Sequence, residues 1–301
     1  MSAGATARPL GEAPATAPAT PAAPRRRGQW GTRLRRRWTG WAGLLVLAVL
    51  LAAAALAPLL APYDPNAIDV ARKLEGPSAT HLLGTDHLGR DLLSRLLHGG
   101  RTALVLGLLA VTGTLILALL SGGLAGYFGG TLDLLVSAAF NILLTVPGLI
   151  LTLAIIGVLG TGQVSLLVAL IGAEWAAQGR LVRGAVLEAR EQGYVEAARV
   201  VGGGDAHILV RHILPNVGST VAVLATLDLA GVVLTVTSLS FLGIGVQPPQ
   251  ADWGTMLNDA RPFAGTYPWM MVLPGACIVA FAVSANLAGD AVRDLLDPQR
   301  R

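Results

Sequence analysis

Cysteine and charged side chains are both scarce in this chain. Cys277 is the single cysteine among 301 residues, so no intramolecular disulfide can form and no cluster of soft metal ligands exists. Charged residues make up 13% of the chain and hydrophobic residues 53%. An ordinary soluble domain has about 25% charged residues. The composition therefore indicates a membrane protein.

Lysine is almost absent, because Lys73 is the only one. A nucleotide-binding P-loop needs a Gly-Lys-Ser or Gly-Lys-Thr sequence, and Lys73 lies instead between Arg72 and Leu74. The chain therefore cannot hydrolyse ATP through such a loop. It also lacks a His-Glu-x-x-His motif and a recognisable pair of nucleophile and base, so we expect no enzymatic activity and no cofactor.

The net charge of +4 comes almost wholly from arginine. Proteins that bind nucleic acids place basic residues on a solvated face, with aromatic residues between them. Here the arginines stand at the ends of apolar segments. This pattern excludes nucleic acid as a partner.

Apolar residues gather in blocks of about 20, the length that crosses about 30 Å of hydrocarbon as a helix. A layered α/β protein would show shorter apolar runs broken by turns. We therefore predict an all-α integral membrane protein with six transmembrane helices, surrounded by the lipid bilayer. The predicted spans are 41–61, 102–127, 132–159, 164–182, 221–246 and 269–289. Pro147 should kink the third span.

The first 38 residues form a different kind of segment. Met1 to Pro24 is rich in alanine, proline and threonine, and we predict disorder for the whole arm 1–38. Arginines stand directly before the first apolar block, and positive charge there holds the N-terminus in the cytoplasm. The block is too long for a signal peptide, so we expect an uncleaved anchor. Six spans then place the C-terminus in the cytoplasm too, with residues 39–301 as the transmembrane domain.

The stretch from about residue 190 to 216, between the fourth and fifth spans, carries a motif. It consists of Glu196, Ala197 and Ala198, followed by Gly202 and then by Leu214 and Pro215. This pattern resembles the EAA loop of permease subunits in bacterial ABC importers. The resemblance implies a short helix that seats in a groove of a separate ATPase subunit. The residue types suit this role, because small alanines allow close backbone approach and a glycine ends a helix with a turn.

The resemblance covers the chain from Trp41 to Pro298. Five further motifs carry it: Leu60 to Pro65, Gly84 to Asp91, Ala125 to Gly130, Leu239 to Gly243, and Gly289 to Pro298. Together they look like the C-type permease subunit of dipeptide, oligopeptide and nickel importers. The family implies a type I ABC importer fold in the bacterial inner membrane. Its implied partners are a second permease subunit in a heterodimer, ATPase subunits and an extracytoplasmic substrate-binding protein.

Details of these motifs bear on the substrate. His87 and the segment Leu224 to Asp228 look closer to nickel permeases than to dipeptide permeases. We therefore expect nickel or a nickel chelate, with dipeptides or oligopeptides as the alternative. A channel or secondary transporter that works without ATP is a remote alternative. It would show inverted repeats with paired broken helices, which we do not find in the sequence, and it would not need the loop Glu196–Pro215.

Three polar residues in the predicted spans are candidates for the translocation path, because such residues are costly inside a membrane. They are Asn141 in the third span, Glu174 in the fourth and Asp228 in the fifth. Asp228 is flanked by two leucines and is the most deeply placed. The alternative is that Asp228 pairs with an arginine or with the backbone of a neighbouring helix and only holds the helices together.

The segment after the first span contains possible metal ligands. Asp86, His87, Asp91 and His98 offer oxygen and imidazole groups that nickel accepts. The same Gly-Thr-Asp frame belongs equally to peptide-importing members of the family, which handle no metal. We therefore predict no metal site here, and we expect Arg90 and Asp91 to order the loop by pairing.

Overall fold

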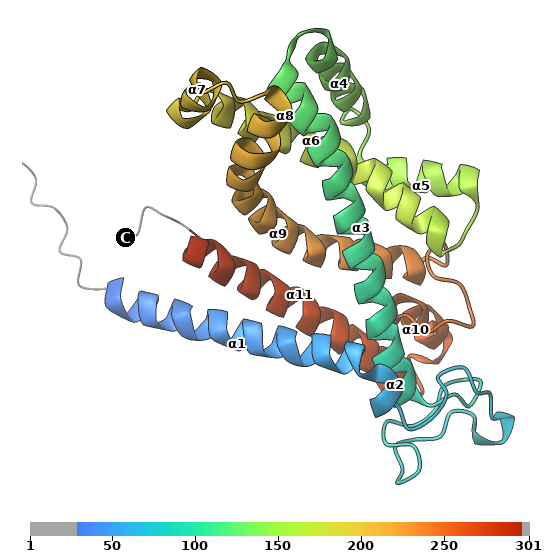
Figure 1. Ribbon diagram of the computed structural model, residues 1–301. Helices are drawn as coiled ribbons and strands as arrows, with labels where there is room; N and C mark the ends of the chain where they lie inside the picture. Colours follow the sequence, from blue (N-terminus) through green and yellow to red (C-terminus); the bar gives the residue numbers. More distant parts are fainter. Residues whose placement is uncertain (1–28, 297–301) are drawn as a thin grey trace, which may run out of the picture.

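The computed structural model describes residues 29–296 as helices joined by loops (Figure 1). The elements are α1 (Gln29–Ala55), α2 (Ala57–Leu60), η1 (Val70–Arg72), α3 (Leu92–Phe128), α4 (Gly130–Leu143), α5 (Gly148–Leu159), α6 (Gln163–Arg190), α7 (Gly193–Val200), α8 (Asp205–Ile208), η2 (Leu209–Ile213), α9 (Leu214–Phe241), α10 (Trp253–Ala260), η3 (Arg261–Phe263) and α11 (Trp269–Leu296). Within this range a single isolated β-bridge joins Thr85 to Asp91. The predicted all-α class is confirmed.

Helix length and composition identify fewer membrane spans than the sequence predicts. Within residues 29–296, two segments are long and apolar enough to cross a membrane, α3 and Trp269–Gly289 of α11. The pair α4 and α5 makes a third if it is one span. The apolar parts of α1 and α9, Gly40–Ala55 and Asp228–Phe241, are shorter. The count of six spans stays a prediction.

The third predicted span is divided rather than continuous. Its two halves, α4 and α5, are bent by 91° at a short break that ends with Pro147, directly before α5. Proline lacks a backbone N–H and disfavours helical geometry in the residue before it, here Val146. The predicted kink at Pro147 is therefore confirmed as a sharp break.

The first predicted span and the predicted arm meet inside one helix. α1 begins at Gln29, so residues 29–38 are helical rather than disordered; arginine is a good helix former, and the apolar segment continues the same helix. Met1–Gly28 lie outside the described residues. α1 ends at Ala55, and Pro58 lies in the first turn of α2. The predicted span 41–61 is thus divided.

Two further helices, α3 and α6, extend beyond the ends of the predicted spans because their polar residues are accommodated within the helices. α3 begins at Leu92 instead of Thr102, since the carboxylate of Asp91 accepts the backbone N–H of Ser94 at 2.8 Å and so caps the helix. α6 runs past the predicted end at Val182 to Arg190. Hydropathy marks the apolar part of a helix, and these helices extend beyond it.

Glycines bring α3 and α6 into close contact along their length. A Cβ atom on Gly122 of α3 would overlap the carbonyl oxygen of Gly179 on α6, and one on Gly126 would lie 2.9 Å from the carbonyl oxygen of Arg183. Small residues let membrane helices approach until their backbones nearly touch. The two helices therefore form a rigid pair that crosses the molecule.

The two ends of α3 carry different parts of the chain (Figure 1). At its N-terminal end lie the loop 61–91 and α10, whereas α4, α7 and α8 lie at the other end. α1 and α11 run side by side in opposite directions, with Gly43 directly against the side chain of Leu287. Both ends of the described chain therefore lie at the same end of this helix pair.

Candidate functional site

The predicted coupling loop contains a short helix, α7, that is apolar on one side. Val195 is fully buried, whereas Glu196 and Ala197 are exposed and Ala198 is half-buried. The helix ends as the glycine-rich sequence requires. Gly202 has a φ of +88°, and the N–H of Gly203 donates to the carbonyl oxygen of Ala198 at 2.9 Å. This left-handed glycine and its hydrogen bond form a Schellman turn, which stops α7 sharply.

An apolar cluster fixes the loop to the membrane helices. Val195 and Ile208 pack in it with Tyr127 at the end of α3 and Val186 of α6. The hydroxyl group of Tyr127 also donates to Asp205 at 2.7 Å. The loop is thus an extension of the helix bundle and not a separate appendage.

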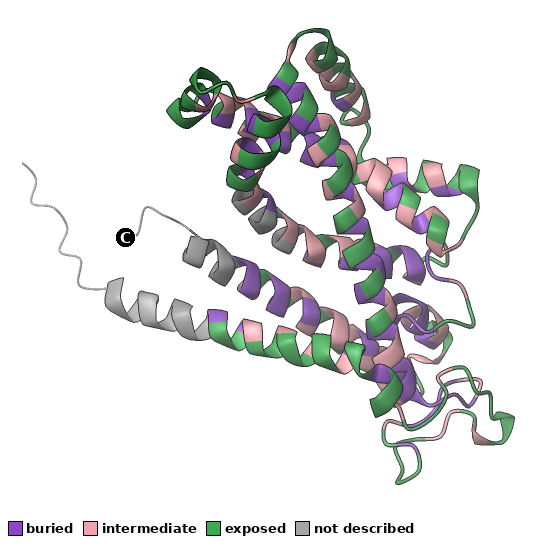
Figure 2. Ribbon diagram, viewed as in Figure 1, coloured by how far each residue is buried: buried purple, intermediate pink, exposed green. Residues whose placement is uncertain are grey.

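The loop exposes apolar side chains next to charged ones such as Glu196 and Arg199. Val200 and Val201 are 83% and 88% exposed, and Val210 is 63% exposed. Figure 2 colours most of the ribbon at the α7 end of the molecule as exposed. Exposed apolar side chains that are grouped together mark a surface for a protein partner. Of the remaining loop residues, Leu214 packs against the apolar cluster, and Pro215 lies exposed in the first turn of α9.

A cavity of about 210 Å³ lies between α3, α6 and α9. It is lined by Val111, Thr114, Leu115, Leu170, Glu174, Gln178, Asp228, Gly231, Val232 and Thr235. The structure thus brings together Glu174 and Asp228, which are 54 positions apart in the sequence. Asn141 lies outside the cavity, where its side-chain oxygen accepts a hydrogen bond from Arg180 at 2.8 Å.

Asp228 is bonded to an amide and not to an arginine. The side-chain nitrogen of Gln178 donates to its carboxylate, and within the described range no salt bridge joins Asp228 to a basic residue. Gln178 was not among the predicted site residues, although its spacing of four from Glu174 puts both on one face of α6. On the same helix as Gln178, Arg183 pairs with a carboxylate of another helix, Asp133 of α4.

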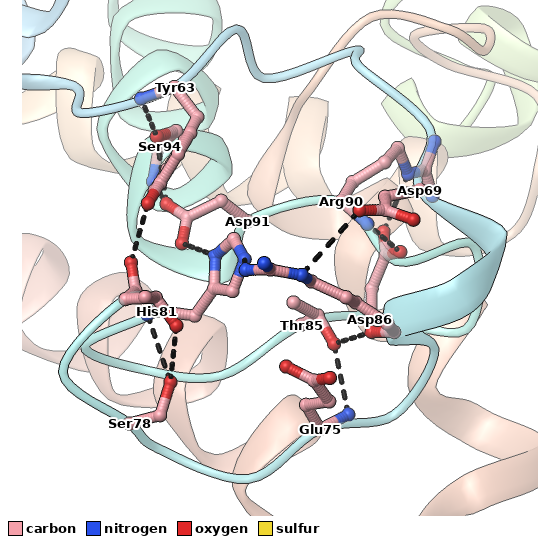
Figure 3. A network of polar contacts seen from close by, with 12 residues as sticks. Tyr63, Asp69, Glu75, Ser78, His81, Thr85, Asp86, Arg90, Asp91 and Ser94 are labelled. Atoms are coloured by element: carbon pink, nitrogen blue, oxygen red, sulfur yellow. Dashed lines mark hydrogen bonds and ion pairs between the residues drawn. The ribbon is translucent and has the colours of Figure 1, made fainter.

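A second polar network lies at the N-terminal end of α3 (Figure 3). The buried carboxylate of Asp86 accepts from Arg90 Nε at 2.6 Å, and Arg95 Nε lies 3.5 Å away. Arg90 also reaches Asp259 of α10 at 3.1 Å. The network therefore ties the loop 61–91 to α3 and α10. Sequence reasoning missed Arg95 and Asp259, because their partners are set by the tertiary fold.

Three of the four potential nickel ligands of this loop, Asp86, Asp91 and His98, have hydrogen-bond partners, whereas the buried Nδ1 of His87 has none in the described part of the chain. Asp91 binds Nδ1 of His81 at 2.9 Å, and Arg72 donates to the other ring nitrogen of that histidine, so His81 carries its proton on Nδ1. His98 Nδ1 bonds the carbonyl oxygen of Ser94, and His87 stacks on a phenylalanine ring. Across residues 29–296 no group of three or more such side chains is placed to hold a metal ion. Arg90 and Asp91 do not pair with each other as expected, because Arg90 binds Asp86 and Asp91 binds His81.

Asp252 is a fully buried carboxylate at the start of α10. One oxygen accepts the backbone N–H of Gly254 at 2.8 Å, which caps the helix. The other oxygen, Oδ1, is buried and has no hydrogen-bond partner in the described part of the chain. Burial raises the pKa of Asp252 from its ordinary value of 3.8 to about 6, against the opposing effect of its hydrogen bonds.

This pKa predicts a pH dependence of stability. Between the unfolded value near 3.9 and about 6, the folded chain binds more protons than the unfolded chain. The free energy of unfolding should therefore rise as the pH falls from about 7 to about 4. Thermal unfolding of the purified protein at pH 7.5 and pH 5 measures this difference. Asp252→Asn should reduce it, whereas Asp64→Asn, which changes an exposed carboxylate, should leave it unchanged. If Asp252→Asn showed the same difference in thermal stability between pH 7.5 and pH 5 as the wild type, the raised pKa of Asp252 would not be its cause.

The family of inner membrane components of binding-protein-dependent transport systems matches residues 115–301 of the chain. The chain belongs to this family. It is a non-catalytic, multi-pass component of the inner membrane, with the permease fold of that family. A second family, described as the N-terminal TM domain of oligopeptide transport permease C, matches residues 28–77. A transporter of this class works with a binding protein and an ATPase.

Individual relatives of this permease have different named substrates. The nickel transport system permease protein NikC of Escherichia coli strain K12 is 40% identical over 265 residues, which cover 88% of this chain and 96% of NikC. The glutathione transport system permease protein GsiD of Pectobacterium atrosepticum is 40% identical over 271 residues, 90% of each chain. The dipeptide transport system permease protein DppC of Alkalihalophilus pseudofirmus is 37% identical over 269 residues, 89% of this chain and 88% of DppC. The expected closeness to the nickel branch is therefore not confirmed.

Proposed function

We propose that this permease forms one half of the translocation pathway of an ATP-driven importer, with a second, different permease subunit as the other half. The chain would cross the membrane six times with both termini in the cytoplasm. The position of the described ends at one end of the α1–α11 pair supports this topology. The cluster of arginines before the first apolar block supports a cytoplasmic N-terminus.

Coupling to the ATPase is assigned to the loop 190–216. The exposed side chains of Val200 and Val201, close in sequence to Glu196 and Ala197, are the observation that carries this proposal, since they leave apolar area uncovered on a loop fixed to α3 and α6. Gly202, Leu214 and Pro215 hold the loop in shape. Closure of the ATPase subunits would displace the loop and, with it, the helices around the cavity. Glu174 and Asp228 line the pathway.

Nickel or a nickel chelate is the proposed substrate, and a dipeptide or oligopeptide is the second candidate. The nickel-like details of the sequence favour the first, and the equal similarity to peptide-transporting relatives supports the second.

Uptake by cells that contain or lack this chain distinguishes the two substrates. At limiting external nickel, deletion should lower cellular nickel at least about threefold, measured by elemental mass spectrometry, and the intact gene should restore it. Uptake of a radiolabelled dipeptide is measured in the same strains. A fall in dipeptide uptake alone would assign peptides and overturn nickel. If neither solute changes, both substrate proposals fail, but membership of the family stands.

A further inference from the structure

The polar groups around the cavity between α3, α6 and α9 come from three separate helical faces. Thr114 belongs to α3, Glu174 and Gln178 are four residues apart on α6, and Asp228 and Thr235 are about two turns apart on α9. The remaining walls are apolar side chains and Gly231. A volume of about 210 Å³ is large enough for a small solute group or for several water molecules of about 30 Å³ each.

Two acceptors of this cavity, the carboxylate of Glu174 and the side-chain oxygen of Gln178, have no hydrogen-bond donor among the described residues. Glu174 makes no hydrogen bond or salt bridge in the described part of the chain, and its nearest oxygen lies 3.8 Å from the position that a Cβ atom on Gly148 would occupy. The side chain of Gln178 is 7% exposed, and its oxygen is buried without a partner among the described residues. Its nitrogen is already used by Asp228.

Such an arrangement is costly unless something occupies the cavity. A buried acceptor without a donor costs about 1–3 kcal/mol, and more when it is charged. Among the described residues, no arginine, lysine or histidine lines this cavity, so they supply no compensating charge there. The lining residues Val111 to Leu115 lie near the middle of α3, the longest apolar helix described, where water screening is weakest.

We propose that this cavity is a subsite for positively charged groups of the solute during its passage. Glu174 and Asp228 would face the charge, and Gln178 would hold Asp228 in place through its side-chain nitrogen. A protonated amine of a peptide and a hydrated divalent metal ion both present this chemistry, because each combines positive charge with hydrogen-bond donors. The inference rests on the proposed transport function and adds to it a preference for cationic solutes.

Uptake measurements on the complete transporter test the subsite and identify the source of the charge. The probes are radioactive Ni²⁺ and radiolabelled dialanine. The variants are Glu174→Gln, Asp228→Asn and their combination, which keep the side-chain shapes and remove the charges. The double variant should lower uptake of the transported probe at least about tenfold, the equivalent of one charged hydrogen bond. Glu188→Gln alters an exposed carboxylate on the same helix and should stay within about twofold of wild type.

Each result of the uptake test has one meaning. A fall for Ni²⁺ alone assigns the subsite to a metal ion, and a fall for dialanine alone assigns it to an ammonium group. Unchanged uptake of both probes in the double variant, with normal amounts of the complex in the membrane, would overturn the subsite and leave the transport function intact. Failure of the wild type to take up either probe overturns the substrate proposal, and the cavity is then decided by stability.

The second measurement is the melting temperature of a variant that carries a positively charged side chain on the wall of the cavity. A Cβ atom on Gly231 would meet nothing within 4 Å, so a longer side chain at this position extends into open space. Gly231→Lys should melt at a higher temperature than Gly231→Met, because the ammonium group satisfies the acceptors. The advantage should vanish when Glu174→Gln and Asp228→Asn are also present. An equal melting temperature for the lysine and methionine variants would overturn the inference whatever the solute.

Discussion

Val201→Asp should abolish binding of the ATPase to this permease and reduce uptake at least about a hundredfold. Val201 is 88% exposed, so an aspartate costs the isolated chain almost nothing. In the complex the carboxylate would be buried in an apolar interface, where an unpaired charge costs about 3–5 kcal/mol. Co-purification of the ATPase with the tagged permease measures association, and uptake in cells measures transport.

The matched control is Gln192→Asp, which adds the same charge to the same loop at the residue before α7. Gln192 is exposed, and an aspartate at the start of a helix is favourable. It should retain the ATPase. The combination of Glu196→Ala and Gly202→Ala should also lose it, because the second change strains the backbone at a φ of +88°. Normal association in both loop variants would refute the assignment of the coupling loop.

Asp86→Ala should destabilise the permease by about 3–5 kcal/mol, enough to remove most of it from the membrane. Its carboxylate accepts from Arg90 and faces Arg95, and these two arginines are 4% and 2% exposed. Asp86 also accepts the backbone N–H of Leu88 at 2.8 Å. Its removal would leave two buried positive charges with Asp259 as their remaining carboxylate in the described network.

Asp69→Ala is the control for this second experiment. Asp69 belongs to the same loop and lies 3.7 Å from Arg72, but both side chains are about half exposed. Pairs of this kind contribute about 0–1 kcal/mol. Membrane abundance and thermal melting of both variants give the comparison. A loss of stability as small in Asp86→Ala as in Asp69→Ala would show that water reaches the network.

The fold class could be predicted from the sequence because hydropathy alone separates a membrane bundle from a soluble domain. Boundaries could not, as α3 shows. Its first turns contain Arg95, which is 2% exposed, and no measure of hydropathy would place an arginine in a buried helix. Arg95 is tolerated there because Asp86 and Asp259 neutralise it, and both belong to other elements. Such compensation depends on contacts that form only in the folded chain.

Only part of the candidate site could be predicted, because the sequence shows single polar residues but not the contacts between helices. The cost of a carboxylate in an apolar segment identified Glu174 and Asp228 one at a time. Their convergence on one cavity depends on how α6 and α9 pack. Gln178 was not predicted as a site residue, although its place one turn after Glu174 is visible in the sequence. Asn141 was predicted as a polar residue within a span, but it is exposed on α4 beside Arg180.

The apolar cluster beneath α7 is separate from the cluster that holds α1 and α11. It contains Tyr127 of α3, Val186 of α6 and Val217 of α9, so a push on the loop reaches all three walls of the cavity at once. The buried residues of α1 and α11 belong to a different cluster around the outer end of α3. With Arg95 as the pivot, Tyr127 lies about 48 Å away along the helix, and a rotation of about 5° would move it by about 4 Å. If closure of the ATPase tilts it, the long helix would act as a lever that turns a small rotation into a displacement of several ångströms.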